Sequence, residues 1–524
     1  MMFVDNLGQY GIVKDKPSYD LPINAWSDGL NVRCFENSIQ KFTGHRPALG
    51  TPTVAPFFLL PIKTSTDALW VYCGSAAVYA TQGSASGTHK NITRSSGAYN
   101  ASTTLQDWTG LVFGGIGILN NSGDVPQMWS PVNFATPQLL QDLSNWPTGY
   151  KCKAISGFKN FLIAMNVSVT SGGSTTENPR LFKWSHGSAT NAVPTSWDAT
   201  DATKDAGEFD IASTNGAILN GKHLKDTFVI AKEDAIWGAN YIGPPFIFRF
   251  FSISEEFGAL SKHSMVETEI GLVIFGTDDL VLCDGQSVKS ITTKKMRRYI
   301  YNTIDATYYG NSFCALNQPH GEVWICYPTS GNTFPNEAVI WNYKENTFGV
   351  RELPNTPHIE KGIVNPSDAL DWTESGAWDD DLEEWDSKVY NPAASRLMLA
   401  DAGNTKLFLM DTTNQFDSSD FDSYVERTGI HLDDPSKIKL VTKVHLNMEK
   451  TGQPTGEIEV MVGSANSPDG STDWSSPTTF NPETQSKIDC LVSGKYLALR
   501  VQSSSDVGWK LNSYAMNIVD NGVD

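Results

Sequence analysis

The chain has 524 residues, of which 11% are aromatic, and a formal net charge of −19 at pH 7. A charge this negative repels polyanions, which argues against affinity-driven binding of nucleic acid, although DNA could slide past without sticking. Gly, Ser, Thr, Asn and Asp are abundant between short apolar runs, a balance that favours strands and turns and predicts an all-β protein.

The first residues, MMFVDNLGQYGIVKDK, contain no apolar core of the length that a signal peptide needs. No run approaches the roughly 20 apolar residues of a membrane helix. We therefore expect a protein without an export signal or a membrane anchor. The seven cysteines are scattered and form no Cys-x-x-Cys pair, which favours reduced, mostly buried thiols in a protein folded in a reducing cytosol.

Residues 1–56 predict an extended N-terminal arm. Gly and Pro punctuate this segment and leave room only for short strands, such as a hairpin formed by 31–35 and 38–42. A segment of this kind has no core of its own, so it is expected to lie on another part of the molecule.

A hairpin pattern begins near residue 57 and then recurs along the chain. Two apolar runs break at a polar turn and resume at once, as in TFVIAKEDAIWGANY and GLVIFGTDDLVLC. The paired runs span residues 69–79, 111–129, 160–184, 227–241, 271–283, 322–350 and 396–410. A strand-based period of about 45 residues is typical of a β-propeller, whose four-stranded blades cannot bury their faces alone. Residues 57–423 thus predict a β-propeller of six to eight blades, with stacked sandwiches as the alternative.

Residues 292–302 (TTKKMRRYIYN) interrupt the β pattern. Met296 and Ile300 offer one apolar face, and Thr292 or Thr293 can cap the first turn, so a short helix between blades is expected. The basic cluster in this segment consists of Lys294, Lys295, Arg297 and Arg298. A solvated helix face explains the cluster without any function. Its functional interpretation is a subunit interface, where it would pair with a neighbour's acidic surface; contact with DNA phosphates is a further alternative.

Residues 360–392 form an acidic insertion within the predicted propeller. Between Glu360 and Asp386 there are ten carboxylates and a single lysine. Repeated around a ring of identical subunits, such carboxylates would form a negative constriction that repels the DNA backbone and eases its passage. The proposed DNA-channel lining consists of Asp379, Asp380, Asp381, Glu383 and Glu384. A solvated loop is one alternative, and a calcium loop is another, although DDDLEEWD lacks the alternating spacing of calcium ligands.

The end of the chain predicts a second module. Residues 411–423 (DTTNQFDSSDFDS) are interpreted as an acidic linker that separates the propeller from residues 424–524. Runs such as LVTKVHLNM, EIEVMVGSA and YLALRVQSS alternate like strands, so a β-sandwich-like module is expected. Residues 467–474 (SPDGSTDW) approach the Asp-box of sialidases, but the glycine comes one position early, and an Asp-Gly hairpin is the preferred interpretation.

Signatures of catalysis are largely absent. The sequence has no H-E-x-x-H helix, no G-x-x-x-x-G-K-[ST] phosphate loop and no G-x-S-x-G elbow. The nine histidines have no metal-like spacing and are interpreted as surface or turn residues. The sequence therefore predicts a protein that is not an enzyme, with no catalytic, cofactor-binding or metal-binding residues.

Residues 21–48, LPINAWSDGLNVRCFENSIQKFTGHRPA, resemble the opening of the tail nozzle proteins of short-tailed (podovirus-type) bacteriophages, also called tail hub or packaged-DNA stabilisation proteins. The matching pieces are Leu21, Pro22 and Asn24, followed by 31–33 and 41–47. The resemblance continues through EEFGALSKHSMVETEIGLVIFGTDDLVLCDGQSVKSI, the basic segment, GEVWICYP and the Trp-Asp pairs of the acidic insertion. It ends with SGKYLALRVQ and MNI. It covers nearly the whole chain through loose patterns and not through one strict motif.

The resemblance implies a structural virion protein, a subunit of a hexameric nozzle that closes the portal channel, retains packaged DNA and conducts it during ejection. The implied partners are further copies of the chain, the portal adaptor (head-completion) protein, tail fibre or spike and needle proteins, and double-stranded DNA passing without sequence specificity. The implied location is the virion tail, after synthesis in the bacterial host cytoplasm. The rival hypothesis is a propeller-type phage protein that binds or degrades polysaccharide, with the acidic loop presenting paired carboxylates to stacked sugars.

Overall fold

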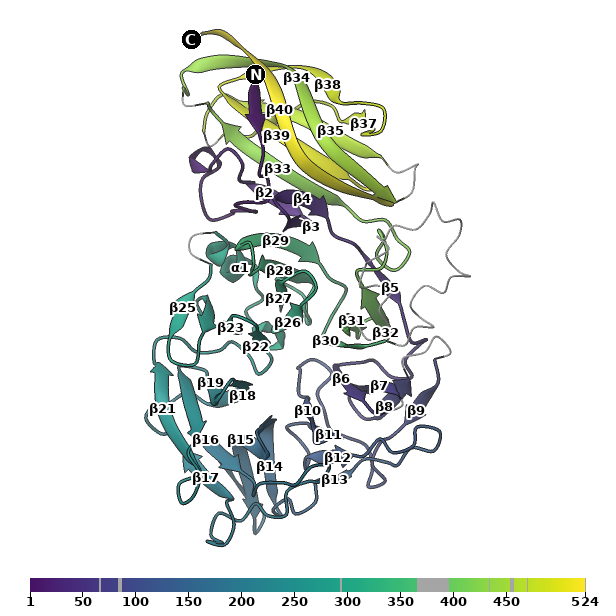
Figure 1. Cartoon of the computed structure of the whole chain (residues 1–524), viewed down its shortest axis with the longest axis vertical. Coiled ribbons are helices and arrows are strands. Elements are labelled where there is room, and N and C mark those ends of the chain that lie inside the picture. The colour runs from purple at the N-terminus through teal and green to yellow at the C-terminus, as the bar shows by residue number, and fades with distance from the viewer. Residues whose placement is uncertain are drawn as a thin grey trace.

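The computed structural model of the chain is almost entirely antiparallel β-structure (Figure 1). It describes residues 1–65, 67–82, 87–292, 295–364, 395–432, 434–452, 457–468 and 470–523. Over these residues the strands form six four-stranded sheets, one six-stranded sheet and one ten-stranded sheet. The all-β class predicted from the composition is therefore confirmed.

Seven units of four strands fill the lower part of Figure 1. Units one to three are β6 (Phe58–Lys63), β7 (Ala68–Cys73), β8 (Val78–Gln82) and β9 (His89–Asn91); β10 (Thr109–Phe113), β11 (Ile116–Asn120), β12 (Gln127–Trp129) and β13 (Gln141–Asp142); and β14 (Tyr150–Phe158), β15 (Phe161–Ser171), β16 (Ser174–Trp184) and β17 (Gly207–Asp210). Units four and five are β18 (Ile218–Leu224), β19 (Thr227–Lys232), β20 (Ile236–Tyr241) and β21 (Phe248–Ser254); and β22 (Met265–Thr268), β23 (Gly271–Phe275), β24 (Leu280–Cys283) and β25 (Val288–Ser290). Units six and seven are β26 (Phe313–Asn317), β27 (Glu322–Tyr327), β28 (Glu337–Asn342) and β29 (Thr347–Glu352); and β30 (His358–Ile363), β31 (Ser395–Asp401), β32 (Lys406–Met410) and β5 (His45–Pro47).

Each of the seven predicted hairpins falls in a different unit, and its strands pair as antiparallel neighbours. The hairpin prediction is thus confirmed, because each apolar run buries its side chains between adjacent units. The first strands of consecutive units contact one another in sequence order, and β30 of unit seven also contacts β6 of unit one. Figure 1 shows the units arranged around a common centre.

The fourth strand of unit seven comes from the N-terminal arm. β5 pairs antiparallel with β32, so that Arg46 lies opposite Leu409. Gly44 precedes β5 and passes so close to the linker that a Cβ atom there would lie 1.9 Å from the Gln415 carbonyl oxygen. Only glycine fits at this crossing.

The C-terminal strands contribute to two sheets, shown at the top of Figure 1. Their strands are β33 (Ser423–Ile430), β34 (Lys437–Gly452), β35 (Ile458–Ala465), β36 (Asp473–Trp474), β37 (Thr478–Phe480), β38 (Lys487–Gly494), β39 (Tyr496–Ser503) and β40 (Val507–Val523). One sheet has the order β2-β33-β39-β35-β36, with β37 also on β35, and the other places β40, β34 and β38 side by side. β36 folds back antiparallel on β35, so the segment likened to an Asp-box does form a hairpin, although Asp469 itself lies outside the described residues.

The first four strands of the arm lie among these C-terminal sheets and unit six. They are β1 (Met2–Val4), β2 (Asp28–Leu30), β3 (Val32–Phe35) and β4 (Ser38–Lys41). β1 pairs with β40, β2 pairs with β33, and the β3–β4 hairpin bridges β29 of unit six to β40. One ten-stranded sheet runs from unit six through the arm into the C-terminal strands. This sheet crosses the boundaries that the sequence predicts between the arm, the propeller and the C-terminal module.

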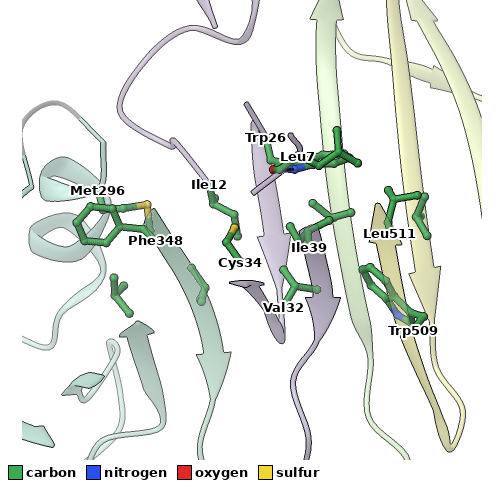
Figure 2. Close-up of a cluster of buried hydrophobic side chains, with 14 of the residues drawn as sticks. Leu7, Ile12, Trp26, Val32, Cys34, Ile39, Met296, Phe348, Trp509 and Leu511 are labelled. Carbon is green, nitrogen blue, oxygen red and sulfur yellow. Dashed lines mark hydrogen bonds between the residues drawn. The ribbon is translucent and has the colours of Figure 1, made fainter. Parts of the chain in front are cut away.

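A continuous apolar core follows this sheet. Figure 2 shows Met296 and Phe348 near unit six, Ile12, Cys34 and Val32 in the arm, and Leu511 and Trp509 on β40. Six of the seven cysteines are buried, which confirms the expectation of buried thiols, and Cys490 is half-buried.

The expected helix is present but begins later than predicted. α1 spans Arg297–Thr303, and its N-cap is Met296, without a side-chain hydrogen bond. Capping by Thr292 is wrong, because its hydroxyl donates to the buried Asp279 carboxylate, and Thr293 lies outside the described residues. The cap is supplied by the arm instead: Asp15 accepts hydrogen bonds from the backbone N–H groups of Arg298 and Tyr299 at 2.8 and 3.1 Å. Two short 3₁₀ turns, η1 (Ser18–Asp20) and η2 (Tyr309–Asn311), complete the described elements. None of the helices described is long and apolar enough to span a membrane.

Candidate functional site

The acidic residues predicted to line a DNA channel, Asp379, Asp380, Asp381, Glu383 and Glu384, lie outside the described residues. The boundary of the acidic insertion needs a correction. Residues 360–363 belong to β30, where they pair with β31, so Glu360 is part of unit seven. The alternation of HIEKGI already carried this strand signal.

The basic cluster is divided between the fold and the surface. Lys295 is half-buried, and its ammonium donates to the Asn346 carbonyl at 2.8 Å. Burial lowers the pKa of this lysine. Arg297 and Arg298 are exposed on α1, and Lys294 lies outside the described residues. A structural role thus accounts for Lys295, while the two arginines remain available to a partner.

A cavity of about 1110 Å³ lies among the first strands of the units. Residues of β10, β14, β18, β22, β26 and β30 line it, together with the turns that follow several of these strands. The titratable lining residues, apart from Cys314 and Tyr343, are Lys159, Lys222, Lys225, Lys361, Asp226, Glu267, Glu269, Glu360 and His223. Four lysines therefore balance four carboxylates, so the lining has no net charge when its histidine is neutral.

The rim of the cavity, where first strands turn into second strands, carries contacts between consecutive units. Lys159 of unit three lies 3.8 Å from Asp226 of unit four, and His223 of unit four lies 3.3 Å from Glu267 of unit five. These side chains are largely exposed, and exposed ion pairs contribute about 0–1 kcal/mol each. The pairs therefore shape the rim without contributing much to stability.

Lys222 of β18 and Glu360 of β30 are half-buried charged groups of the lining. Burial raises the pKa of the Glu360 carboxyl, and the charge of Lys222 opposes that rise. Burial also dominates the pKa shifts of Cys314, His263 and His358, and Lys222 contributes to all three. One ammonium is thus close enough to influence groups on three other units.

Aromatic and imidazole rings pack against one another at the starts of the first strands, which lie opposite the rim of the cavity. The rings of His263 and His358 lie 5.4 Å apart, and the Phe58 ring lies 4.5 Å from His358. His263 Nε2 is 2.7 Å from the Trp108 carbonyl, and the Leu59 N–H donates to His358 Nδ1 at 3.3 Å. Burial lowers the pKa of His263 to about 3 and that of His358 well below its usual value, so both rings are neutral.

The interpretation of the histidines as surface or turn residues is therefore wrong for several of them. His45 and His358 are buried, and His263 is half-buried. His263 precedes β22 and His358 begins β30, so the two occupy related positions in units five and seven. Aligning the repeats by the starts of their first strands could have paired these residues, whereas metal-ligand spacing could not.

A second polar site lies where the arm, unit six and the linker meet. Arg33 of β3 donates to Asp411 at 2.9 Å, and its Nε lies 3.3 Å from Glu322 of β27. Asp411 also accepts hydrogen bonds from Thr43 at 2.7 Å and from Asn317 at 3.0 Å. Residue 411 was expected to open an acidic linker between modules, and its carboxylate is part of a mostly buried polar network.

The guanidinium of Arg351 completes this ion cluster. It is fully buried, 3.8 Å from Asp411, and packs against the rings of Phe42, Trp324 and Phe416 at 4.8 to 5.3 Å. Burial lowers the pKa of Arg351 to about 10. Burial opposes ionisation of Asp411, but Arg33, His320 and Arg351 outweigh that effect and hold its pKa well below the usual value. The cluster therefore joins the arm, unit six and the linker through contacts among their own side chains.

Within the described ranges, no group of three or more His, Cys, Asp or Glu residues is placed to hold a metal ion. The cavity can bind a ligand through Lys222 and Glu360, and the ion cluster can hold the arm in place.

No protein-family profile matches the chain, and no curated protein matches it. Among solved structures the chain is similar to the AfRom2 CNH domain, with 9% identity, a TM-score of 0.36, and coverage of 69% of this chain and 96% of that domain. It is also similar to PorZ, described as an essential bacterial surface component of the type-IX secretion system of Porphyromonas gingivalis, with 7% identity and a TM-score of 0.33. That match covers 77% of this chain and 44% of the PorZ chain, so this chain spans less than half of PorZ.

Proposed function

We propose that this chain is a structural subunit of the tail nozzle of a short-tailed bacteriophage. In this proposal six copies form a ring on the portal adaptor, retain the packaged DNA and conduct it during ejection. Fibre or spike and needle proteins would attach to the same assembly. The observation that carries the proposal is the segment that resembles the nozzle family, residues 21–48, because the organisation of the fold depends on it.

The matched residues of this segment occupy structural positions. Asn31 donates from its side chain to Glu352 and to the Asp422 carbonyl, both at 2.8 Å, while Arg33 holds Asp411. Residues 45–47 supply the fourth strand of unit seven. A resemblance confined to incidental surface residues would support the family much less.

We further propose that the seven units are the blades of one β-propeller, a number within the range expected from the sequence. Two observations support this: the contacts between successive first strands return from β30 to β6, and a single cavity is lined by six of the seven first strands. A density map that separates the strands would test it. Two separate stacks of sheets in such a map would refute the propeller.

The DNA path in this proposal lies between subunits and not through the cavity. The cavity is one subunit's interior, its charges balance, and neutral rings pack at one end of its walls. The negative charge of −19 per subunit, including Asp379, Asp380, Asp381, Glu383 and Glu384, would instead repel DNA from the surface of a shared channel. Subunit contacts would use the exposed Arg297 and Arg298.

Exposed apolar side chains supply a second contact surface in this proposal. Phe3 on β1, Leu491 on β38 and Val519 on β40 belong to one sheet and are 65%, 79% and 53% exposed. Covering these side chains with another copy of the chain would remove apolar area from water and so stabilise the proposed ring.

The mass of the particle in solution tests the nozzle proposal. Light scattering is expected to show a ring near six times 57.4 kDa, either for the purified protein or after mixing with the portal and its adaptor. A monomer that never joins the portal complex would overturn the proposal, and cleavage of polysaccharide by that monomer would support the rival function. Replacing the five acidic lining residues by Asn or Gln is expected to change DNA retention or ejection in assembled particles without changing the fold.

A further inference from the structure

The cavity interior presents two charged groups, Lys222 and Glu360, whose hydrogen-bonding capacity is mostly unused among the described residues. Over the described part of the chain, the Lys222 ammonium makes neither a hydrogen bond nor an ion pair. Glu360 accepts one hydrogen bond, from the Lys361 backbone N–H at 3.0 Å, and no cation among the described residues lies within ion-pair distance of it. Both side chains are half-buried and neither is among the fully buried polar groups that lack a partner, so they keep contact with water in the cavity. A ligand that displaces this water must replace its hydrogen bonds.

The two groups are held apart by the fold. Lys222 projects from unit four and Glu360 from unit seven, and each is fixed by a strand that pairs along its length. Their charges act on each other, yet they do not form an ion pair. A molecule between them could accept a hydrogen bond from the ammonium and donate one to the carboxylate.

The charge of the lining limits the kind of molecule that fits. Four lysines and four carboxylates line the cavity, so neither an anion nor a cation gains from the field of the whole lining. An apolar molecule would displace water from Lys222 and Glu360 without replacing its hydrogen bonds. Hydroxyl groups both donate and accept, so they satisfy both residues.

We propose that this cavity binds an uncharged, hydroxyl-rich molecule, a saccharide of one to three units, between Lys222 and Glu360. Its volume of about 1110 Å³ is slightly larger than the range of about 300–1,000 Å³ that is usual for pockets that enclose small ligands, so it leaves room for a saccharide and some water. The ion pair of Lys159 with Asp226 and the contact of His223 with Glu267 frame the entrance. The site lies within one subunit, so it does not depend on the nozzle proposal.

Saturation-transfer NMR and calorimetry on the full chain test this inference, with D-glucose, D-galactose, N-acetyl-D-glucosamine and lactose as probes and inorganic phosphate and putrescine as charged comparators. At least one saccharide is expected to bind. Lys222→Met and Glu360→Gln should each weaken that binding at least about tenfold, as the loss of a hydrogen bond to a charged group predicts. Lys289→Met, at an exposed position on β25, is the matched control and should change nothing.

Three outcomes would overturn the inference: no saccharide binds, saccharide binding survives both substitutions, or a charged comparator binds more tightly and is lost in Lys222→Met. Glu360→Gln keeps the size and shape of the side chain, so it carries the test if Lys222→Met does not fold. Failure of saccharide binding would leave the mass of the assembled ring unaffected, so the two proposals can fail separately.

Discussion

Replacing Asp411 by Asn tests whether the ion cluster holds the arm, unit six and the linker together. The carboxylate accepts hydrogen bonds from Arg33, Thr43 and Asn317 at 2.7 to 3.0 Å. An amide keeps the shape but removes the charge and turns one acceptor into a donor. Arg33 and Arg351, which are 3% and 0% exposed, would remain buried with less compensation.

The magnitude follows from the burial of the cations. Removing one partner of a buried ion pair costs about 3–5 kcal/mol. The Asp411 side chain is 19% exposed, and Arg33 keeps its ion pair with Glu322 in the variant. Asp411→Asn is therefore expected to lower the free energy of unfolding by about 3 kcal/mol, at the low end of that range. Urea unfolding followed by tryptophan fluorescence should show this as a lower midpoint of the first transition.

Asp417→Asn is the matched control. Asp417 lies in the same linker and has a similar left-handed backbone, with φ of 49° against 55° for Asp411, so the backbone preference of Asn cancels. Its ion pair with Lys406 is about one third exposed on each side and should contribute no more than about 1 kcal/mol. Equal midpoints for the two variants would refute the reasoning.

The dependence on pH provides a second check. The pKa of Asp411 is lower in the folded protein than in the unfolded chain, so its contribution is complete above the unfolded value and is lost as the pH falls. The difference in the free energy of unfolding between the wild-type protein and Asp411→Asn should therefore become smaller below about pH 4. A difference that persists unchanged in acid would point to a steric effect of the amide.

Three further predictions concern the histidines, the helix cap and the thiols. His263 and His358 have lowered pKa values and are neutral in the folded protein, so the free energy of unfolding should decline as the pH falls below about 6.5. The decline should reach up to ~1.4 kcal/mol per pH unit for each ring. His358→Gln should therefore flatten the dependence of the melting temperature on pH between 4 and 6.5. Asp15→Ala removes the cap of α1 and should lower the free energy of unfolding, measured by thermal unfolding, by about 1 kcal/mol. Asp20→Ala, at an exposed site in the same arm, should leave it unchanged. Equal losses in the two variants would contradict the role of Asp15 as the cap. Cys490, the half-buried thiol, should react first with a disulfide reagent, and Cys490→Ser should abolish that fast phase while the buried thiols react only on unfolding.

The sequence was informative where structure depends on neighbours in the chain. All seven hairpins could be predicted, because an apolar run, a polar turn and a second apolar run are contiguous and bury both faces. The β3–β4 hairpin was found for the same reason. The cap of α1 was missed, because Asp15 lies far from the helix in sequence and no local pattern indicates it.

The candidate site depends on distant neighbours, so it was largely hidden. Nothing local to Lys222 or Glu360 shows that strands of units four and seven direct both side chains into one cavity. Glu360 was grouped with the carboxylates that follow it, since charge alone does not separate a strand residue from an insertion. The burial of Asp411 was equally unpredictable, because its partners Arg33 and Asn317 come from the arm and from unit six.

The pairing of the arm has a consequence for how the protein folds and holds together. β5 cannot complete unit seven until residues 358–410 have been made, and β1 waits for β40 at the end of the chain. Loop-closure entropy grows only slowly with loop length, so such distant pairings add little to the cost of folding at equilibrium. They slow folding, because the chain must close the loop before the stabilising contacts form. Once formed, the arm joins unit seven, unit six and both C-terminal sheets through separate strands. Separating the C-terminal sheets from the seven units would therefore require breaking the β3–β4 bridge and the ion cluster around Asp411 together, which favours their behaving as one body.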